Sequence, residues 1–145
     1  MTDKNERILV PLDGSKCSEN VLPRVEELAS DRKAGICLLR VVSARTFPGV
    51  DPIEAEVKVV REAEEYLQGL ESQLKTKGLD VDTHVRYGND VDEILDHAAQ
   101  KDIEMVAMST PGYRGVKQLL FGNVAEKVIR HTPKPIFLVQ CNGSV

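Results

Sequence analysis

One stretch in the C-terminal third of the chain places glycines, hydroxyls and an amide at spacings that suit anion binding. It runs from Met108 to Gly115 as Met-Ser-Thr-Pro-Gly-Tyr-Arg-Gly, and Phe-Gly-Asn-Val follows at 121–124. Glycine takes positive φ easily and, without a Cβ, lets a ligand approach the main chain. Nine residues separate Gly112 from Gly122. The stretch could therefore clasp a ligand at two points.

The segments on either side of this stretch decide where its backbone points. The apolar run Ile103 to Met108 predicts a buried strand, and the apolar spacing of Val124 to Ile129 predicts a helix. A strand, a glycine-bearing loop and a helix together aim N–H groups at an anion. Neither G-x-x-x-x-G-K-[ST] nor a G-x-G-x-x-G after the first strand occurs, which excludes a Walker P-loop and the usual dinucleotide fingerprint. The alternative is that the glycines only make turns.

These residues, with Leu119 to Ile129 and Lys134 to Val139, resemble the C-terminal half of universal stress protein domains. Nucleotide-binding members carry a Gly, two residues, a Gly, nine residues, a Gly, and then Ser or Thr. The matching positions here are Ser109, Gly112, Gly122 and Asn123. Ser109 and Asn123 depart from that pattern. Ser109 is also similar to a subgroup that reads Ser-Thr-His-Gly, with Pro111 in place of the His.

Composition narrows the class of protein. We expect a single domain over residues 1–145, with 41% apolar residues to build a core. The net charge of −4 and the absence of a basic stripe exclude a non-specific nucleic-acid binder. We expect no membrane insertion, because no apolar run reaches the about 20 residues that span a bilayer. With no signal-peptide pattern, we expect a cytoplasmic protein whose cysteines, Cys17, Cys37 and Cys141, are reduced thiols.

Apolar periodicity predicts a βαβαβαβαβ chain. The expected strands are Arg7–Leu12, Gly35–Val42, Val81–Tyr87, Ile103–Met108 and Pro135–Val139. Val81–Tyr87 alternates apolar and polar residues, which indicates an edge strand. The fold class is α/β, a three-layer open twisted parallel sheet. The resemblance covers Arg7 to Val139 and implies the strand order 3-2-1-4-5 of a Rossmann-like, adenine nucleotide alpha hydrolase-like domain.

In that order the winding reverses beside the first strand, and ligands bind there at the carboxyl ends of the strands. The ends of the first, second and fourth strands and the glycine loop should therefore meet. The expected nucleotide-binding residues are Pro11, Leu12, Asp13, Ser15, Val41, Met108, Ser109, Thr110, Gly112, Arg114, Gly115, Gly122, Asn123 and Val124.

Each group has an expected role. The N–H groups of Gly112, Gly122, Asn123 and Val124 would receive phosphates at the positive end of the last helix. The side chains of Pro11, Val41 and Met108 would form the apolar walls of an adenine pocket. Asp13 could accept hydrogen bonds from ribose or adenine, or hold Mg²⁺; its alternative is a turn residue bonded to its own backbone. Arg114 could add charge near the phosphates or lie on the solvated surface.

The histidines, Ser15 and Cys17 do not form a recognisable metal or catalytic site in the sequence. His84, His97 and His131 fall on different predicted elements, so we expect them to lie apart without a metal between them. Ser15 lies in Asp-Gly-Ser, which is not a nucleophile elbow. Cys17 has no His paired with it by sequence. We therefore assign no catalytic residue, and the expected chemistry is at most weak ATP hydrolysis.

The leading hypothesis is a cytoplasmic stress-response regulatory domain that binds ATP, or ADP or AMP, with Mg²⁺. The family resemblance implies a homodimer through Pro135 to Val139, since an exposed apolar edge strand needs a partner. Three alternatives stay open. They are a slow Mg²⁺-dependent ATPase, a dimeric partner-binding module that has lost nucleotide binding through Ser109 and Asn123, and a flavin carrier, which the lack of Trp disfavours.

Overall fold

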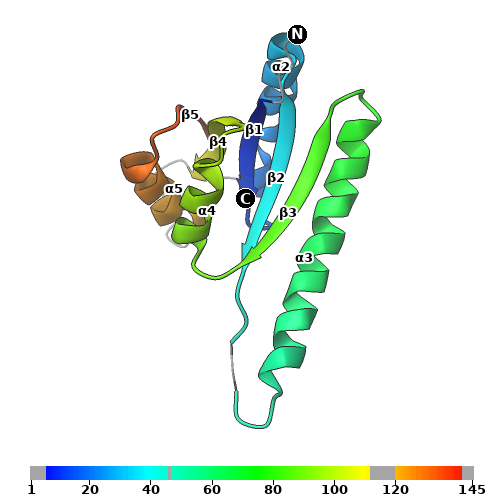
Figure 1. The fold of residues 1–145 in the computed structure, drawn as a ribbon, viewed down its shortest axis with the longest axis vertical. Helices are drawn as coiled ribbons and strands as arrows, with labels where there is room; N and C mark the ends of the chain where they lie inside the picture. The colour runs from blue at the N-terminus through cyan, green and yellow to red at the C-terminus, as the bar shows by residue number, and fades with distance from the viewer. Residues whose placement is uncertain (1–5, 46, 112–119, 142–145) are drawn as a thin grey trace.

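All five predicted strands are present and lie side by side in one parallel sheet (Figure 1). A computed structural model of the protein describes residues 6–45, 47–111 and 120–141. The strands are β1 (Arg7–Leu12), β2 (Gly35–Val42), β3 (Val81–Tyr87), β4 (Ile103–Pro111) and β5 (Ile136–Cys141). Their order is β3-β2-β1-β4-β5, which confirms the expected fold class and places β3 at an edge.

The two neighbours of β1 pair with it over different lengths. β2 stays in register with β1 from Arg7 to Leu12. The pairing of β4 with β1 stops at Leu9, opposite Val106. Pro11 has no N–H to donate to a ladder, so regular pairing ends near it. The carboxyl ends of β1 and β4 are therefore free to separate, and a crevice can form where the winding reverses.

The helices cover both faces of the sheet. They are α1 (Lys16–Glu19), α2 (Leu22–Arg32), α3 (Pro52–Lys75), α4 (Asp90–Ala98) and α5 (Leu120–His131). Helices α1 to α3 pack on one face, where Val10, Leu38 and Leu67 are fully buried. Helices α4 and α5 pack on the other, where Leu9, Leu39 and Val128 are fully buried. Alternate residues of β1 and β2 thus serve the two halves of the core.

Helix boundaries differ from the sequence prediction at three places. The first helical segment is divided into α1 and α2, and Pro23 lies in the first turn of α2, where its missing N–H costs no hydrogen bond. Pro48, Gly49 and Pro52 predict a loop, but helix α3 begins at Pro52, capped by Asp51. Helix α5 begins at Leu120, four residues before the predicted start. The C-terminal residues 142–145, expected as a frayed tail, lie outside the described residues.

The prediction of three reduced cysteines is wrong for two of them. Cys17 in α1 and Cys141 at the end of β5 form a disulfide across a sequence separation of 124 residues. The contact between α1 and β4, and the pairing of β5 with β4, bring the two ends together. Cys37 is a free thiol, as predicted, and it is buried in the core.

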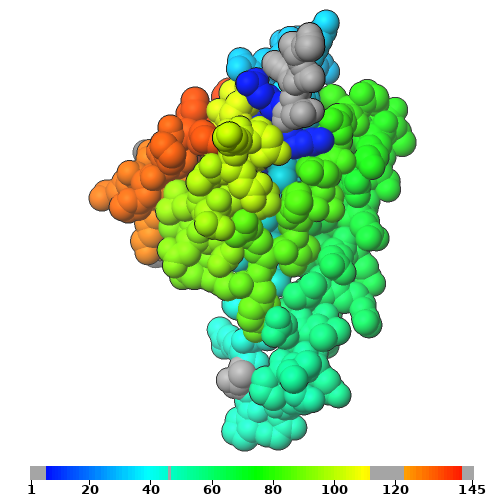
Figure 2. Space-filling model, viewed as in Figure 1, coloured from blue at the N-terminus to red at the C-terminus, as the bar shows by residue number. Residues whose placement is uncertain are grey.

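The first half of α3 projects beyond the sheet (Figure 1), and the space-filling view shows the same end and the preceding segment standing away from the body (Figure 2). Ile53 and Val57 on this end are 71% and 48% exposed. Buried positions in α3 begin only at Ala63. In the part of the chain that the structure describes, no helix combines the length and the apolar character needed to cross a membrane.

Candidate functional site

A cavity lies at the carboxyl ends of β1 and β2, beside the start of α4. It encloses about 220 Å³ and is lined by Pro11, Leu12, Asp13, Leu39, Arg40, Val41, Asp90 and Ile94. Pockets for whole ligands typically enclose about 300–1,000 Å³. The described walls therefore suit part of a ligand, such as one planar ring system. Four of the predicted site residues, Pro11, Leu12, Asp13 and Val41, meet here.

The turn after β1 fixes Asp13 at the cavity wall. Gly14 has φ +89°, a conformation that side chains disfavour, so glycine allows the tight turn. Asp13 Oδ1 accepts from the N–H of Ser15 at 2.8 Å, and Ser15 Oγ caps α1 by accepting from Ser18 N at 3.0 Å. The turn role considered for Asp13 is therefore present. It engages Oδ1, and Oδ2 remains without a hydrogen bond among the described residues.

Arg40 is a site residue that the sequence prediction missed. It lines the cavity, and its guanidinium carbon lies 5.8 Å from the centre of the Tyr66 ring. Its Nε is buried without a hydrogen-bond partner in the described chain. The signal was an arginine inside the otherwise apolar run of β2. A partly buried cation at the cavity wall can receive a polar or anionic ligand group.

A hydrogen bond to Glu19 fixes the orientation of the Tyr66 side chain. Its hydroxyl donates to Glu19 Oε2 at 2.5 Å. Burial raises the pKa of Tyr66, and the hydrogen bond from its hydroxyl to Glu19 raises it further. Tyr66 therefore stays protonated at neutral pH and keeps a fixed ring face for Arg40.

The predicted residues at the end of β4 lie deeper in the protein. Met108 and Ser109 are 0% and 1% exposed. Met108 packs in the core cluster that also contains Leu9 and Leu39. Ser109 Oγ donates to the carbonyl of Ser18 at 3.4 Å, so this hydroxyl links β4 to α1. Thr110 is half-buried.

Helices α4 and α5 form a second groove beside the cavity. This groove is lined by Asn89, Asp90, Val91, Asp92, Leu95, Asn123, Val124, Lys127 and His131, and it shares Asp90 with the cavity. In a helix that begins at Leu120, the N–H groups up to Gly122 have no intrahelical acceptor, whereas those of Asn123 and Val124 donate within the helix. The N–H of Gly122 is therefore free to donate, and its role in phosphate binding stays a prediction. Gly112, Arg114 and Gly115 lie outside the described residues.

The prediction that the histidines lie apart is wrong for two of the three. The ring centroids of His84 in β3 and His97 in α4 are 4.8 Å apart. Burial, together with the positive charge of neighbouring His84 and Arg86, lowers the pKa of His97 to about 4. His97 is therefore neutral at physiological pH. The helical packing that joins the two residues leaves no local pattern in the sequence.

A parallel sheet covered on both faces, with a cavity at the carboxyl ends of its central strands, defines a doubly wound, Rossmann-like α/β domain. The sequence pattern of the universal stress protein family matches residues 4–140. The chain therefore belongs to the universal stress protein family.

Relatives and solved structures agree with this assignment. The universal stress protein YxiE of Bacillus subtilis is 27% identical over 147 residues, covering 92% of this chain and 98% of its own. The structure of hypothetical protein MJ0577 is 26% identical and superposes with a TM-score of 0.79 over 98% of this chain and 100% of its own.

Two other solved structures contain adenine nucleotides. A universal stress protein in complex with cAMP has a TM-score of 0.61 at 22% identity, covering 95% of this chain and 98% of its own. The protein from Archaeoglobus fulgidus in complex with dAMP has a TM-score of 0.63 at 20% identity, covering 94% of this chain and 99% of its own. At these identities the likeness shows a shared fold.

Proposed function

We propose that this protein binds an adenine nucleotide, ATP in the leading version, and acts as a homodimeric regulatory domain of the stress response. The cavity at the carboxyl ends of β1 and β2 carries this proposal. The nucleotides held by the cAMP and dAMP neighbours support the choice of adenine.

The described walls fit a purine. Pro11, Leu39, Val41 and Ile94 supply apolar surface for the ring faces. Asp13 and Asp90 supply carboxylate acceptors for an amine or for ribose hydroxyls. A pocket with apolar walls and a few polar groups at fixed places is the usual design for binding a small molecule.

Phosphates and Mg²⁺ would lie toward α5. The free N–H groups at the start of α5, including that of Gly122, favour an anion, as does the positive end of the helix dipole. Oδ2 of Asp13 is available to a Mg²⁺ ion, which prefers oxygen ligands and bridges phosphates when bound. Arg40 adds positive charge at the cavity wall.

Thermal unfolding with Mg-ATP, ADP and AMP tests the proposal. Ligand at a hundred times Kd adds about 2.7 kcal/mol, which is roughly 5–10 °C for a chain of this size. Val41→Glu, which puts a charge against the purine, should abolish the shift. Val57→Glu on the exposed end of α3 is the matched control and should keep it. Absence of any shift at millimolar nucleotide would contradict the proposal.

Two alternative functions can be tested with variants of the same protein. A slow ATPase would need Asp13 and the metal, so turnover that survives Asp13→Ala would exclude that version. A partner-binding module without nucleotide would follow from Asn123, whose amide is bulkier than the family's hydroxyl. If Asn123→Ser creates ATP binding where the natural protein has none, this second alternative holds.

The dimer is proposed through β5. This strand is an edge of the sheet, and Leu138 on it is 41% exposed. An unpaired apolar edge favours pairing with a second copy. Leu138→Lys should convert the dimer to a monomer in light scattering after gel filtration, and Ile53→Lys on α3 should leave it unchanged. A wild-type monomer at all concentrations would contradict this interface.

We also propose a cytoplasmic location. The cytosol keeps most thiols reduced, so Cys17 and Cys141 would be a dithiol there and would join under oxidising conditions. Thiol trapping of the protein in intact cells, before lysis, measures this state directly.

A further inference from the structure

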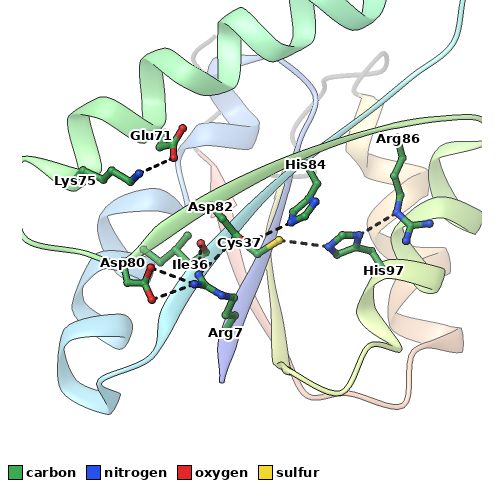
Figure 3. A network of polar contacts seen from close by, with 10 residues as sticks. All are labelled: Arg7, Ile36, Cys37, Glu71, Lys75, Asp80, Asp82, His84, Arg86 and His97. Atoms are coloured by element: carbon green, nitrogen blue, oxygen red, sulfur yellow. Dashed lines mark hydrogen bonds and ion pairs between the residues drawn. The ribbon is translucent and has the colours of Figure 1, made fainter. Parts of the chain in front are cut away.

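A thiol and two imidazoles meet on the sheet face covered by α4, outside the cavity described above. Cys37 comes from β2, His84 from β3 and His97 from α4, and one ligand atom from each lies within 4.8 Å of the others. Figure 3 shows the three side chains pointing toward one another from these separate elements. Because Leu39 pairs with His84 across the two strands, side chains of Cys37 and His84 fall on the same face.

The separations suit a tetrahedral cation. Zn²⁺ binds thiolate at about 2.3 Å and imidazole at about 2.0–2.1 Å, so a bound sulfur and nitrogen lie about 3.6 Å apart. Cys37 Sγ and His97 Nε2 are 3.5 Å apart. For three atoms within 4.8 Å of one another, some point lies no more than about 2.8 Å from all three. Shifts of less than an ångström would therefore complete the bonds.

Two residues of the cluster are buried, and the third is exposed to solvent. Cys37 and His97 are 1% and 3% exposed, whereas the side chain of His84 is 45% exposed. An ion would enter from the side of His84, which can swing without disturbing the core. Burial raises the pKa of the Cys37 thiol, so the thiol is protonated and unreactive in the absence of an ion, and a bound ion would have to displace that proton.

Asp82 supplies the negative charge and the orienting group. Its Oδ2 lies 3.3 Å from His84 Nε2, the arrangement in which a carboxylate positions a ligating histidine. Its Oδ1 is buried without a hydrogen bond and lies 3.4 Å from Arg7 Nη1. Arg7 therefore already offsets part of the charge on Oδ1, and it is through Oδ2 that Asp82 acts on the cluster.

Arg86 opposes metal binding in the present arrangement. Its Nε donates to His97 Nδ1 at 2.9 Å, which leaves the His97 proton on Nε2, facing Cys37. On coordination the thiol proton leaves to solvent, the His97 proton moves from Nε2 to Nδ1, and Arg86 must release that ring. Arg86 Nη1 would still donate to Glu93 Oε1 at 2.9 Å and to Asp96 Oδ2 at 2.7 Å.

We propose that Cys37, His84 and His97 form a binding site for one thiophilic divalent cation, Zn²⁺ being the ion that the donor set fits best, with the fourth position open to water. The site is separate from the nucleotide cavity but shares α4 with it, since Asp90 and Ile94 line the cavity. It does not rest on the proposed nucleotide function.

The oxidised protein offers a direct test, because Cys37 is the free cysteine while Cys17 and Cys141 are bonded. Metal-free protein is titrated with Co²⁺ and followed by absorption, then with Zn²⁺ by calorimetry. We expect one ion per chain and a thiolate-to-cobalt charge-transfer band that Zn²⁺ displaces. Cys37→Ala should remove the band, and His84→Ala should weaken Zn²⁺ binding about tenfold or more. His131→Ala, on the surface of α5, is the matched control and should change neither.

Arg86→Met keeps the proposal testable if Cys37→Ala does not fold. Removing the competing donor to His97 should tighten Zn²⁺ binding, by about tenfold, and intensify the cobalt band. A role for the three residues in packing alone predicts no band in either protein. Absence of the thiolate band in the wild type and in Arg86→Met, or Zn²⁺ affinity equal in the wild type and Cys37→Ala, would overturn the proposal.

Discussion

Reducing the bond between Cys17 and Cys141 should lower the stability of the protein by a large and calculable amount. The bond closes a loop with a sequence separation of 124 residues. In the chain-entropy model a loop of this length restricts the unfolded state by about 5 kcal/mol at 25 °C. For a chain of this size, 1 kcal/mol corresponds to roughly 2–4 °C in Tm. We therefore expect the reduced protein to melt roughly 10–20 °C below the oxidised one.

Calorimetric melting with and without dithiothreitol measures this effect. Cys17→Ser and Cys141→Ser each break the same bond, so both should match the reduced wild type and should not respond to dithiothreitol. Thiol titration of the denatured oxidised protein should find Cys37 as the free cysteine. If all three cysteines of the sequence react, or if reduction leaves Tm unchanged, the reasoning is wrong.

Three further outcomes follow from the geometry. Arg40→Met should weaken nucleotide binding about tenfold by removing a charge-assisted contact, and Arg40→Lys should restore part of it, as calorimetry would show. His97 has a folded pKa of about 4 against an ordinary 6.5. The unfolded state therefore binds the proton first, and stability, complete above pH 6.5, should fall by about 3 kcal/mol toward pH 4. Urea titrations in EDTA across this range should show the loss, and His97→Gln should abolish it. Leu67→Ala, at a fully buried position of α3, should cost about 2–5 kcal/mol in urea unfolding, whereas Val57→Ala should stay within about 0.5 kcal/mol.

Much of the fold was predictable because strands and helices leave periodic signals. The runs Arg7–Leu12 and Gly35–Val42 are strands with the predicted bounds, and the polar alternation of Val81–Tyr87 indicated the edge position that it occupies. A proline in a strand predicts the end of regular pairing, and the ladder between β1 and β4 stops just before Pro11. These features depend on neighbouring residues, so the sequence carries them locally. The strand order came from the family resemblance.

The contacts that were missed are all long-range. Cys17 and Cys141 meet only because β5 lies at one edge and α1 packs against β4. His97 reaches His84 only because the last turn of α4 lies over β2 and β3. Arg40 was hidden inside a run that was otherwise apolar. The predicted residues at the ends of β1 and β2 line the cavity. Their roles in binding, like those given to the glycine loop, remain predictions.

The long overhang of α3 implies that protection from solvent exchange changes along a single helix. A 24-residue helix is about 36 Å long, whereas a seven-residue strand such as β3 spans about 23 Å. From Ala63 onward, Leu67 and Leu74 anchor the helix to the core, so their amides should exchange only when the whole domain opens. The turns around Ile53 have no sheet beneath them, and short unsupported helices are marginal in water. Deuterium should therefore enter that end through local fraying, orders of magnitude sooner than the other.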